Sequence, residues 1–236
     1  MGRADNYLIL QPSISGLAPN AMHYQTILFD LDGTLTDPRE GITRSVQYAL
    51  AKLGIDEPDL AALEHFIGPP LLQCFMATYA LDEATGWQAV NHYRERFRVT
   101  GLYENRVFDG VEALLEALVA QGRTLYIATS KPTVFAEEIA RHFGFDRYFK
   151  RIYGSELDGT RTNKVELLAH LLESERLAPA SALMIGDRKH DLIGARSNGL
   201  PAVAVGYGFG SREELLGEAP DFHFETLEQM HRAFGC

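Results

Sequence analysis

Two aspartates near the start of the chain have the spacing to do chemistry together. The segment Thr26–Phe29 consists of β-branched and apolar residues, which predicts a buried strand, and Asp30, Asp32 and Gly33 follow it closely. Asp and Gly are unfavourable in strands, so we expect the strand to end here in a loop. Two carboxylates this close repel each other and are hard to desolvate. A hard cation such as Mg²⁺, which prefers carboxylate oxygen, would offset that cost.

A pair of carboxylates can also divide the work of a reaction. One can attack a substrate as a nucleophile, while the other exchanges protons with the leaving group. The competing interpretation is that D-x-D-G is only an acidic turn. For this motif alone the two interpretations are equally good, so the choice depends on the rest of the chain.

The composition restricts the classes of partner and compartment. The chain has 236 residues, of which 46% are hydrophobic and 23% charged, and this is typical of a globular protein with one large domain or a core with an insertion. The formal net charge is -10 without a basic block, so a nucleic-acid polymer is not an expected partner. The two cysteines, Cys74 and Cys236, form no disulfide framework or metal quartet, which favours a reducing, cytoplasmic location.

Residues 1–21 differ in character from the rest of the chain. Tyr7–Leu10 is an apolar run, but it is far too short for a membrane span or a signal-peptide core, and no later run is long enough either. We interpret residues 1–21 as a flexible extension and expect no membrane partner. Met22, just before the first predicted strand, is a candidate for the natural start.

The next segment has the periodicity of helices and no intervening strand. Apolar residues at helical spacing between Ile42 and Leu53 form one face of a predicted helix. The helices are expected at Pro38–Leu53, Pro58–Phe66, Leu71–Leu81 and Glu83–Val99. We predict that residues 38–103 form an inserted helical cap; the alternative is a helical layer packed directly on the main sheet.

Strands and helices alternate after Val107. Strands are predicted at Thr124–Ala128, Arg151–Gly154, Ala182–Ile185, Ala202–Val205 and Asp221–Phe224, with helices between them. This alternation is typical of βαβ units, so we predict an α/β fold with a doubly wound parallel sheet formed by residues 22–37 and 104–236. Ligands of such sheets bind at the carboxyl ends of the strands.

Polar residues stand at the ends of several predicted strands and at the start of one helix. They are Asp30, Asp32, Thr129, Ser130, Lys164, Asp187 and Asp191. Carboxylates can hold a divalent cation and supply a nucleophile, while hydroxyls, a lysine and N–H groups at a helix start can bind an anion. If the sheet is parallel, these residues gather at one edge, where together they suit a phosphate ester attacked by an aspartate.

The same residues carry a family resemblance. D-L-D-G-T-L-T-D, A-T-S-K-P, N-K and I-G-D-R-K-H-D resemble, in order, the four motifs of the haloacid dehalogenase (HAD) superfamily of phosphohydrolases. The insertion after the first motif lies where that superfamily carries a helical C1 cap. The resemblance covers nearly all of Tyr24–Phe234 and implies a Rossmann-like core. G-Y-G-F-G-S-R-E-E-L is similar to the phosphoglycolate phosphatase branch, and G-S-E-L-D-G-T-R-T-N-K is similar to a sister group named 5′-nucleotidases.

The resemblance implies a role for each matching residue. Asp30 would be the nucleophile that forms an aspartyl-phosphate, and also a Mg²⁺ ligand. Asp32 would protonate the leaving alkoxide and then activate water, with its main-chain carbonyl on the metal. Thr129 would hold the phosphoryl oxygens, and Lys164 would neutralise Asp30 and the phosphate.

Some of these assignments have alternatives. Asp187 would bind Mg²⁺ directly or through water, and Asp191 would support the site, but Asp191 could instead be only the N-cap of the next helix. Ser130 could make the phosphate contact in place of Thr129.

Other charged residues near the motifs are interpreted as exposed loop residues. These are Lys131, Arg188, Lys189 and His190. Lys164 could also be a solvated lysine, although a lysine at a helix start is unfavourable to the helix dipole, which favours a functional role.

The predicted cap offers three candidate substrate contacts. The stiff loop that contains Gly68 and Pro69 could reach into the cleft, and Arg44 on the first cap helix could meet a carboxylate or a second phosphate. The alternatives are a plain turn and a surface arginine.

The resulting prediction is a Mg²⁺-dependent phosphomonoester hydrolase that acts on a small phosphate ester through a covalent aspartyl-phosphate. Phosphoglycolate and nucleoside 5′-monophosphates are the leading substrates. The alternatives are a phosphomutase, which would return the phosphoryl group to its substrate, and a non-catalytic protein that binds Mg²⁺ and phosphate. No heptad run distinguishes a monomer from a homodimer.

Overall fold

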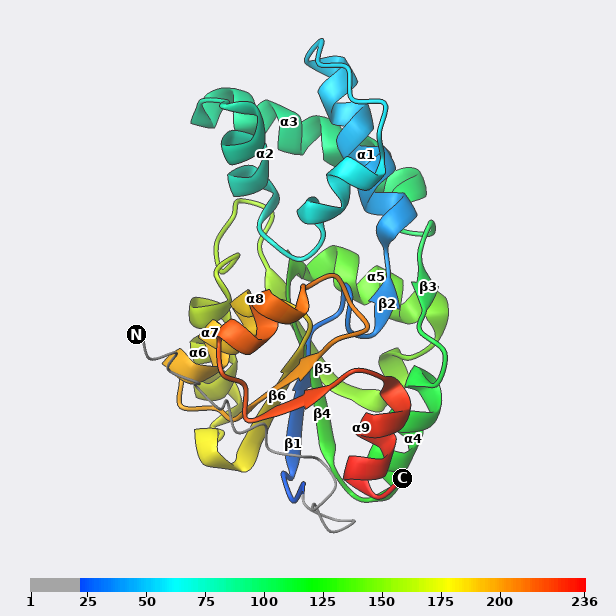
Figure 1. Ribbon diagram of the computed structural model, residues 1–236, viewed down its shortest axis with the longest axis vertical. Helices are drawn as coiled ribbons and strands as arrows, with labels where there is room; N and C mark the ends of the chain where they lie inside the picture. Colours follow the sequence, from blue (N-terminus) through cyan, green and yellow to red (C-terminus); the bar gives the residue numbers. More distant parts are fainter. Residues whose placement is uncertain (1–21) are drawn as a thin grey trace, which may run out of the picture.

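The computed structural model describes residues 22–236, and the extension predicted for residues 1–21 lies outside the described residues. The main strands are β1 (Thr26–Phe29), β4 (Thr124–Pro132), β5 (Phe149–Ser155), β6 (Ala182–Gly186), β7 (Ala202–Val205) and β8 (Phe222–Phe224). Within the described range they form a six-stranded sheet in the order β5-β4-β1-β6-β7-β8, and every neighbouring pair is parallel (Figure 1). The predicted parallel sheet is therefore confirmed.

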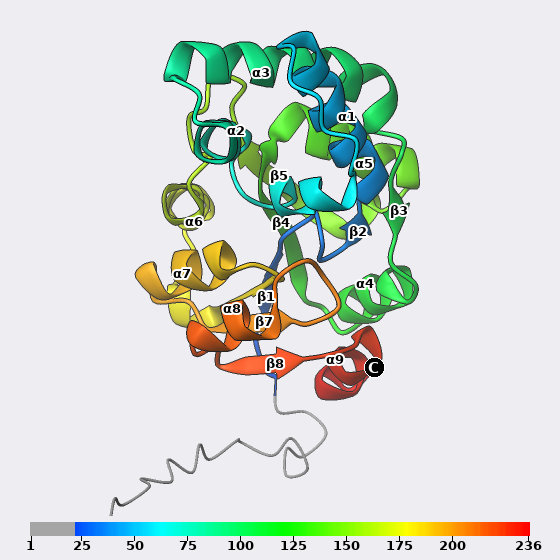
Figure 2. The same cartoon turned by 45° about the horizontal axis from the view of Figure 1, so that its top comes forward.

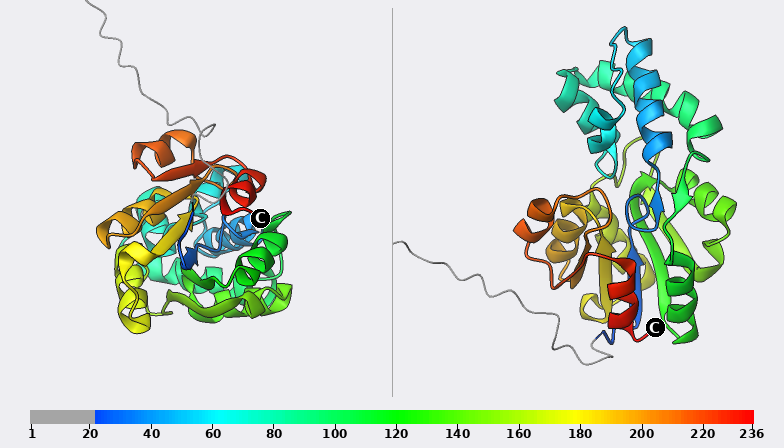
Figure 3. Two further views of the ribbon diagram at one scale, coloured as in Figure 1. Left: turned by 90° about the horizontal axis from the view of Figure 1, so that it is seen from below. Right: turned by 45° about the vertical axis from the view of Figure 1, so that its right-hand side comes forward.

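Helices cover both faces of this sheet (Figure 3). The face that carries Ile27 and Phe29 packs against α4 (Val111–Ala120), α5 (Thr133–Phe143) and α9 (Leu227–Phe234). The face that carries Leu28 packs against α6 (Lys164–Glu175), α7 (Lys189–Ser197) and α8 (Arg212–Gly217). Because successive strand residues point to opposite faces, the short apolar run of β1 supplies both cores. The fold is the predicted doubly wound, Rossmann-like α/β core.

A group of helices, here called the helical insert, lies between two short strands, β2 (Thr36–Asp37) and β3 (Arg106–Val107). It consists of α1 (Arg39–Lys52), the 3₁₀-helix η2 (Ala61–Phe66), α2 (Leu71–Tyr79), α3 (Glu83–Arg96) and the π-helix η3 (Phe97–Gly101). The insert lies beyond the carboxyl ends of the central strands (Figures 1 and 2). That residues 38–103 form a separate cap domain stays a prediction.

The strands β2 and β3 pair with each other in an antiparallel ribbon that the sequence analysis did not predict. Each strand is only two residues long, so neither has a periodic pattern that could reveal it. The chain therefore leaves the core and returns to it through adjacent, hydrogen-bonded residues.

The first helix of the insert shows how its amphipathic pattern packs. In α1 the buried side chains include Ile42, Val46 and Leu50, whereas Arg44 is exposed. At 14 residues, α1 is too short to span a bilayer, and no helix within the described range 22–236 has the length and apolar character of a membrane span.

Several element boundaries differ from the predictions. The strand predicted to end at Ala128 continues to Pro132, and the helix predicted from Leu192 begins at Lys189. The first turn of α7 is polar, so apolar periodicity could not reveal it. Instead of the helix predicted from Pro58, the chain forms only the 3₁₀-helix η2. Two further single-turn 3₁₀-helices, η4 (Asp146–Tyr148) and η5 (Pro179–Ser181), lie later in the chain.

Candidate active site

The register of the central strands brings three carboxylates together. Phe29 of β1 aligns with Ile127 of β4 and Ile185 of β6, so the residues that follow these three positions lie at one level of the sheet. The backbone N–H of Asp30 donates to the carbonyl of Ile185 at 2.9 Å. Asp30, Asp187 and Asp191 are all buried, and one carboxylate oxygen of each lies within 4.8 Å of the others.

Neighbouring loops hold Asp187 in this cluster. Its Oδ2 accepts from the backbone N–H of Phe209 at 2.8 Å, and its Oδ1 accepts from Thr34 Oγ1 at 3.2 Å. A side chain at Gly33 or Gly208 would occupy the space of the Asp187 carboxylate. Burial, followed by the charges of Asp30 and Asp191, raises the pKa of Asp187 well above its ordinary value. Negative charge is thus in excess at this edge of the sheet.

Lys164 is the cation within the cluster. Its Nζ lies 3.0 Å from Asp30 Oδ1 and 2.8 Å from Asp191 Oδ1, and it donates to the carbonyl of Ala128 at 2.8 Å. Burial alone would lower the pKa of Lys164, but Asp191 and Asp30 outweigh burial and raise it. The lysine is therefore a charged, fixed group at the start of α6.

Asp191 contacts both the start of α7 and Lys164. Its Oδ2 accepts from the backbone N–H of Arg188 at 3.1 Å, as a residue in the first turn of α7 can, while its Oδ1 faces Lys164. Burial raises the pKa of Asp191 to about 6, against the opposing effect of Lys164. It is not the N-cap itself, because Arg188 occupies that position.

Asp32 is not part of this group of three carboxylates and pairs with a lysine. Its Oδ2 lies 2.6 Å from Lys131 Nζ. Burial raises the pKa of Asp32, and Lys131 opposes this shift. The interpretation of Lys131 as an exposed loop residue is therefore wrong: it is 8% exposed, because β4 continues past Ala128 and carries Lys131 into the site.

The two hydroxyl residues after Ala128 have different surroundings. Thr129 is buried, and its Oγ1 accepts from the backbone N–H of Lys131 at 3.2 Å. Ser130 lines the neighbouring cavity, and its carbonyl accepts from Ser155 Oγ at 2.9 Å. Both lie at the carboxyl end of β4, so both remain candidates for the phosphate contact.

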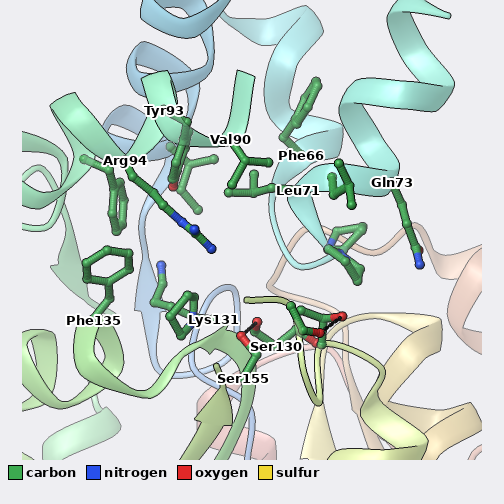
Figure 4. Close-up of a pocket in the computed structure, with 18 of the residues that line it drawn as sticks. Phe66, Leu71, Gln73, Val90, Tyr93, Arg94, Ser130, Lys131, Phe135 and Ser155 are labelled. Atoms are coloured by element: carbon green, nitrogen blue, oxygen red, sulfur yellow. Dashed lines mark hydrogen bonds between the residues drawn. The ribbon is translucent and has the colours of Figure 1, made fainter. Parts of the chain in front are cut away.

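A cavity of about 220 Å³ lies between the sheet edge and the helical insert. The core side of its lining includes Asp32, Ser130 and Lys131. Its aromatic lining residues are Phe66, Trp87, Tyr93, Phe97 and Phe135. Figure 4 shows Arg94 pointing into the cavity from the insert. The cavity therefore combines a largely aromatic lining with the carboxylate of Asp32.

The structure brings some of the predicted substrate contacts to this cavity. Gly68 and Pro69 line it. Arg44 does not: its exposed side chain pairs with Glu40 at 2.9 Å. The sequence analysis missed Arg94, because no local signal distinguishes it from the other arginines of the insert.

Arg188 connects the loop of the insert to the core. Its Nη1 donates to the carbonyl of Ile67, and its Nε lies 3.0 Å from Glu214 Oε1. Arg188 is partly buried, so its interpretation as an exposed loop residue is also wrong, whereas Lys189 is exposed as expected. His190 is partly buried, and burial lowers its pKa.

Comparisons with known proteins agree on a family. The model of the haloacid dehalogenase-like hydrolases matches residues 27–205. A protein from Pseudomonas aeruginosa named 5′-nucleotidase is 71% identical over 90% of this chain and 96% of its own length. Tyrosine-protein kinase PtkA of Mycobacterium tuberculosis is 37% identical over 89% of this chain and 72% of its own length.

More distant relatives and solved structures point the same way. A phosphoglycolate phosphatase of Vibrio vulnificus is 27% identical over 86% of this chain and 93% of its own length. The crystal structure of a predicted phosphatase from Clostridium acetobutylicum superimposes with a TM-score of 0.88 at 46% identity, covering 89% of this chain and 98% of that one. This chain therefore belongs to the haloacid dehalogenase-like hydrolase family.

Proposed function

We propose that this chain is a Mg²⁺-dependent phosphomonoesterase that works through a covalent aspartyl-phosphate on Asp30. The observation that carries the proposal is that the carboxylates of Asp30, Asp187 and Asp191 lie close to one another and to Lys164, beside the cavity. Buried carboxylates in such excess suit a hard divalent cation, and the raised pKa of Asp187 marks the charge that a cation would neutralise.

The donor set fits Mg²⁺. The carboxylates of Asp30 and Asp187 and the main-chain carbonyl of Asp32 would hold the ion, with Asp191 in support. When bound, Mg²⁺ supplies positive charge that stabilises the transferring phosphoryl group.

The residues of the chain carry the chemical steps. Asp30 attacks the phosphorus atom, the bond from phosphorus to the leaving oxygen breaks, and Asp32 gives its proton to that oxygen. Asp32 then accepts a proton from a water molecule that attacks the aspartyl-phosphate, which releases phosphate and restores Asp30. Lys164, with Thr129 or Ser130, holds the phosphoryl oxygens in place.

Nucleoside 5′-monophosphates are the substrate class that we favour. The relative at 71% identity is named 5′-nucleotidase, and the cavity beside Asp32 has aromatic walls that suit a nucleobase. Phosphoglycolate is the second candidate, because a carboxylate could pair with Arg94. The expected partner is thus a small cytoplasmic phosphate ester rather than a nucleic-acid polymer or a membrane. We expect the protein to be a monomer or a homodimer.

The test is phosphate release from nucleoside monophosphates, phosphoglycolate, sugar phosphates and ATP, with Mg²⁺ and with EDTA. Asp30→Asn is the blank, and Asp146→Asn, which alters an exposed carboxylate, is the matched control. We expect turnover that requires Mg²⁺ and Asp30, and borohydride reduction of quenched enzyme should convert Asp30 to homoserine. Full activity of Asp30→Asn would refute the nucleophile, transfer to a second substrate would indicate a mutase or kinase, and Mg²⁺ binding without turnover would indicate a regulatory protein.

A further inference from the structure

Arg94 is a cation without a protein partner in the wall of the cavity. It lies on α3 and is half-buried, and its guanidinium points into the cavity (Figure 4). Among residues 22–236, no carboxylate forms an ion pair with this guanidinium, and no side-chain hydrogen bond satisfies it. A guanidinium has only donors, so what it lacks is an acceptor.

Arg96, on the same helix, shows what a structural arginine of the insert looks like. Its two terminal nitrogens bind both carboxylate oxygens of Glu104, at 2.7 and 2.8 Å, and one of them also donates to Ser45 Oγ at 3.2 Å. Arg96 therefore has its acceptors within the protein. Arg94, two positions earlier, has none in the described part of the chain.

The guanidinium of Arg94 is partly desolvated without a protein partner within the described range. Burial, followed by the charge of Arg98, lowers the pKa of Arg94. A half-buried charge among aromatic walls loses hydration without gaining a partner. Groups that break local packing rules in this way are expected where a ligand supplies the missing partner.

The guanidinium lies over the ring of Trp87 on the same helix. Its central carbon lies 5.9 Å from the centre of the Trp87 ring, an arrangement that orients its donors. A Cβ added at Gly159 of the core would lie 3.3 Å from Trp87, so the indole is held between the insert and the core. Arg94 and Asp32 thus contribute to one cavity from opposite sides, the insert and the core.

We propose that Arg94 selects the leaving group by binding one edge of it, an edge that carries only hydrogen-bond acceptors. This proposal rests on the function proposed above. For a nucleoside monophosphate this edge is the oxo edge of the base. A 6-oxopurine places O6 and N7 side by side, which a guanidinium can bind with two N–H groups, whereas adenine turns an amino donor toward the same position. The preferred substrates are therefore nucleotides with oxo bases.

A carboxylate has the same acceptor chemistry, but the cavity favours the base. Five aromatic side chains contribute to its walls, and a two-carbon acid would leave most of this apolar surface without a contact. A flat ring system would cover the walls and reach Arg94 at the same time.

The experiment compares kcat/KM for inosine monophosphate, adenosine monophosphate, phosphoglycolate and phenyl phosphate, whose leaving group has no distal acceptor. The variants are Arg94→Met and, as a matched control, Arg98→Met, which removes an exposed arginine of the same insert. We expect the native protein to prefer inosine over adenosine monophosphate by about tenfold or more. Arg94→Met should abolish this preference, with a smaller loss for phenyl phosphate, and Arg98→Met should preserve it.

Two results would overturn the assignment. One is an unchanged ratio between the two purine nucleotides in Arg94→Met. The other is a preference for phosphoglycolate that Arg94→Met removes, because Arg94 would then bind a carboxylate and not a base. Either result leaves the phosphatase proposal intact.

Binding separates this proposal from the proposed function. In the Asp30→Asn background, calorimetry with inosine and adenosine monophosphate reports on Arg94 without any turnover. Tighter binding of inosine monophosphate that is lost on adding Arg94→Met supports the assignment even if no ester is hydrolysed. Equal binding of both nucleotides refutes it.

Discussion

Lys131 Nζ lies 2.6 Å from Asp32 Oδ2 and 4.7 Å from the centre of the Phe97 ring. The lysine belongs to β4 of the core and the phenylalanine to η3 of the insert. Lys131 therefore contacts both Asp32, the proposed general acid, and the helical insert that covers Asp32. The position of Asp32 depends on residues that lie far apart in the sequence.

Replacing Lys131 should change how the rate depends on pH. Lys131 opposes the rise in the pKa of Asp32 that burial causes, so Lys131→Met should raise this pKa further. The proposed acid must be protonated, so the alkaline limb of kcat/KM should move to higher pH. At neutral pH we expect kcat/KM to fall by about tenfold or more, because Asp32 is no longer held in place. Lys131→Arg, which keeps the charge, should shift the limb less, and a limb that stays in place would exclude Asp32 as its cause.

Removing the metal should make stability fall as the pH rises. The pKa of Asp191 is raised to about 6, and that of Asp187 is raised well above its ordinary value. These carboxyls keep their protons longer in the folded than in the unfolded state, so unfolding releases protons and stability is lost as the pH rises. In EDTA, Tm should therefore fall as the pH rises from about 4, the unfolded-state pKa, through about 6, the folded-state pKa of Asp191, and Asp187 should extend the fall to higher pH. Mg²⁺ should reduce the fall. A Tm with the same pH dependence with and without Mg²⁺ would contradict the metal assignment.

Asp187→Asn tests the same charge cluster by mutation. In EDTA at about pH 8 it should raise stability by about 1 kcal/mol or more, because it removes one of three carboxylates that repel each other. Its activity should be strongly reduced, and the gain in Tm on adding Mg²⁺ should disappear. The matched control Asp146→Asn, at an exposed carboxylate, should change neither property.

Gly208 should tolerate no side chain. A Cβ there would collide with Asp187 and with the carbonyl of Gly33, so Gly208→Ala must displace the carboxylate or its loop. We expect kcat/KM to fall by about tenfold or more and half-saturation to need more Mg²⁺. Gly217→Ala is the matched control, since a Cβ at Gly217 meets no atom within 4 Å. Equal activity of the two variants would show that Asp187 does not require its present position.

Glu175 should stabilise the core against acid. Its carboxylate accepts from Lys150 Nζ at 2.7 Å, Tyr153 Oη at 2.7 Å and Tyr126 Oη at 2.8 Å. The hydrogen bond from Lys150, and then that from Tyr153, lower the pKa of Glu175 from 4.5 to about 2. Its contribution is therefore complete above the unfolded-state pKa and is lost as the pH falls through the folded-state pKa.

The measurement is urea unfolding of Glu175→Gln, with the exposed Glu173→Gln as its control. At neutral pH, Glu175→Gln should lower the free energy of unfolding by about 1–2 kcal/mol. The difference from the native protein should shrink between about pH 4.5 and about pH 2. A difference that does not depend on pH would mean that the carboxylate charge contributes nothing.

The sequence predicted the carboxylate cluster because strand order and strand ends have local signals. Asp30 and Asp187 each follow an apolar run, and parallel strands must bring such ends to one edge. Lys131 and Arg94 were not predicted as site residues, because their positions depend on contacts between segments far apart. A lysine one residue farther along an extended strand faces the opposite way, and the sequence does not show where β4 ends.

The sequence located the site, but it did not assign a role to every residue within it. The sequence favoured Thr129 over Ser130 only through the motif resemblance, since both stand near the end of β4 and both carry a hydroxyl. The sequence analysis named Arg44 and not Arg94, although both are arginines on helices of the insert. Only the packing of α1 and α3 shows that one faces solvent and the other the cavity.

The ribbon of β2 and β3 brings the two ends of the insert together. Thr36 pairs with Val107 and Asp37 with Arg106, and the last two side chains form an ion pair at 2.9 Å. The chain thus leaves the sheet and returns to it at neighbouring residues, so a longer, shorter or different segment could join the same two strands without moving the carboxylates.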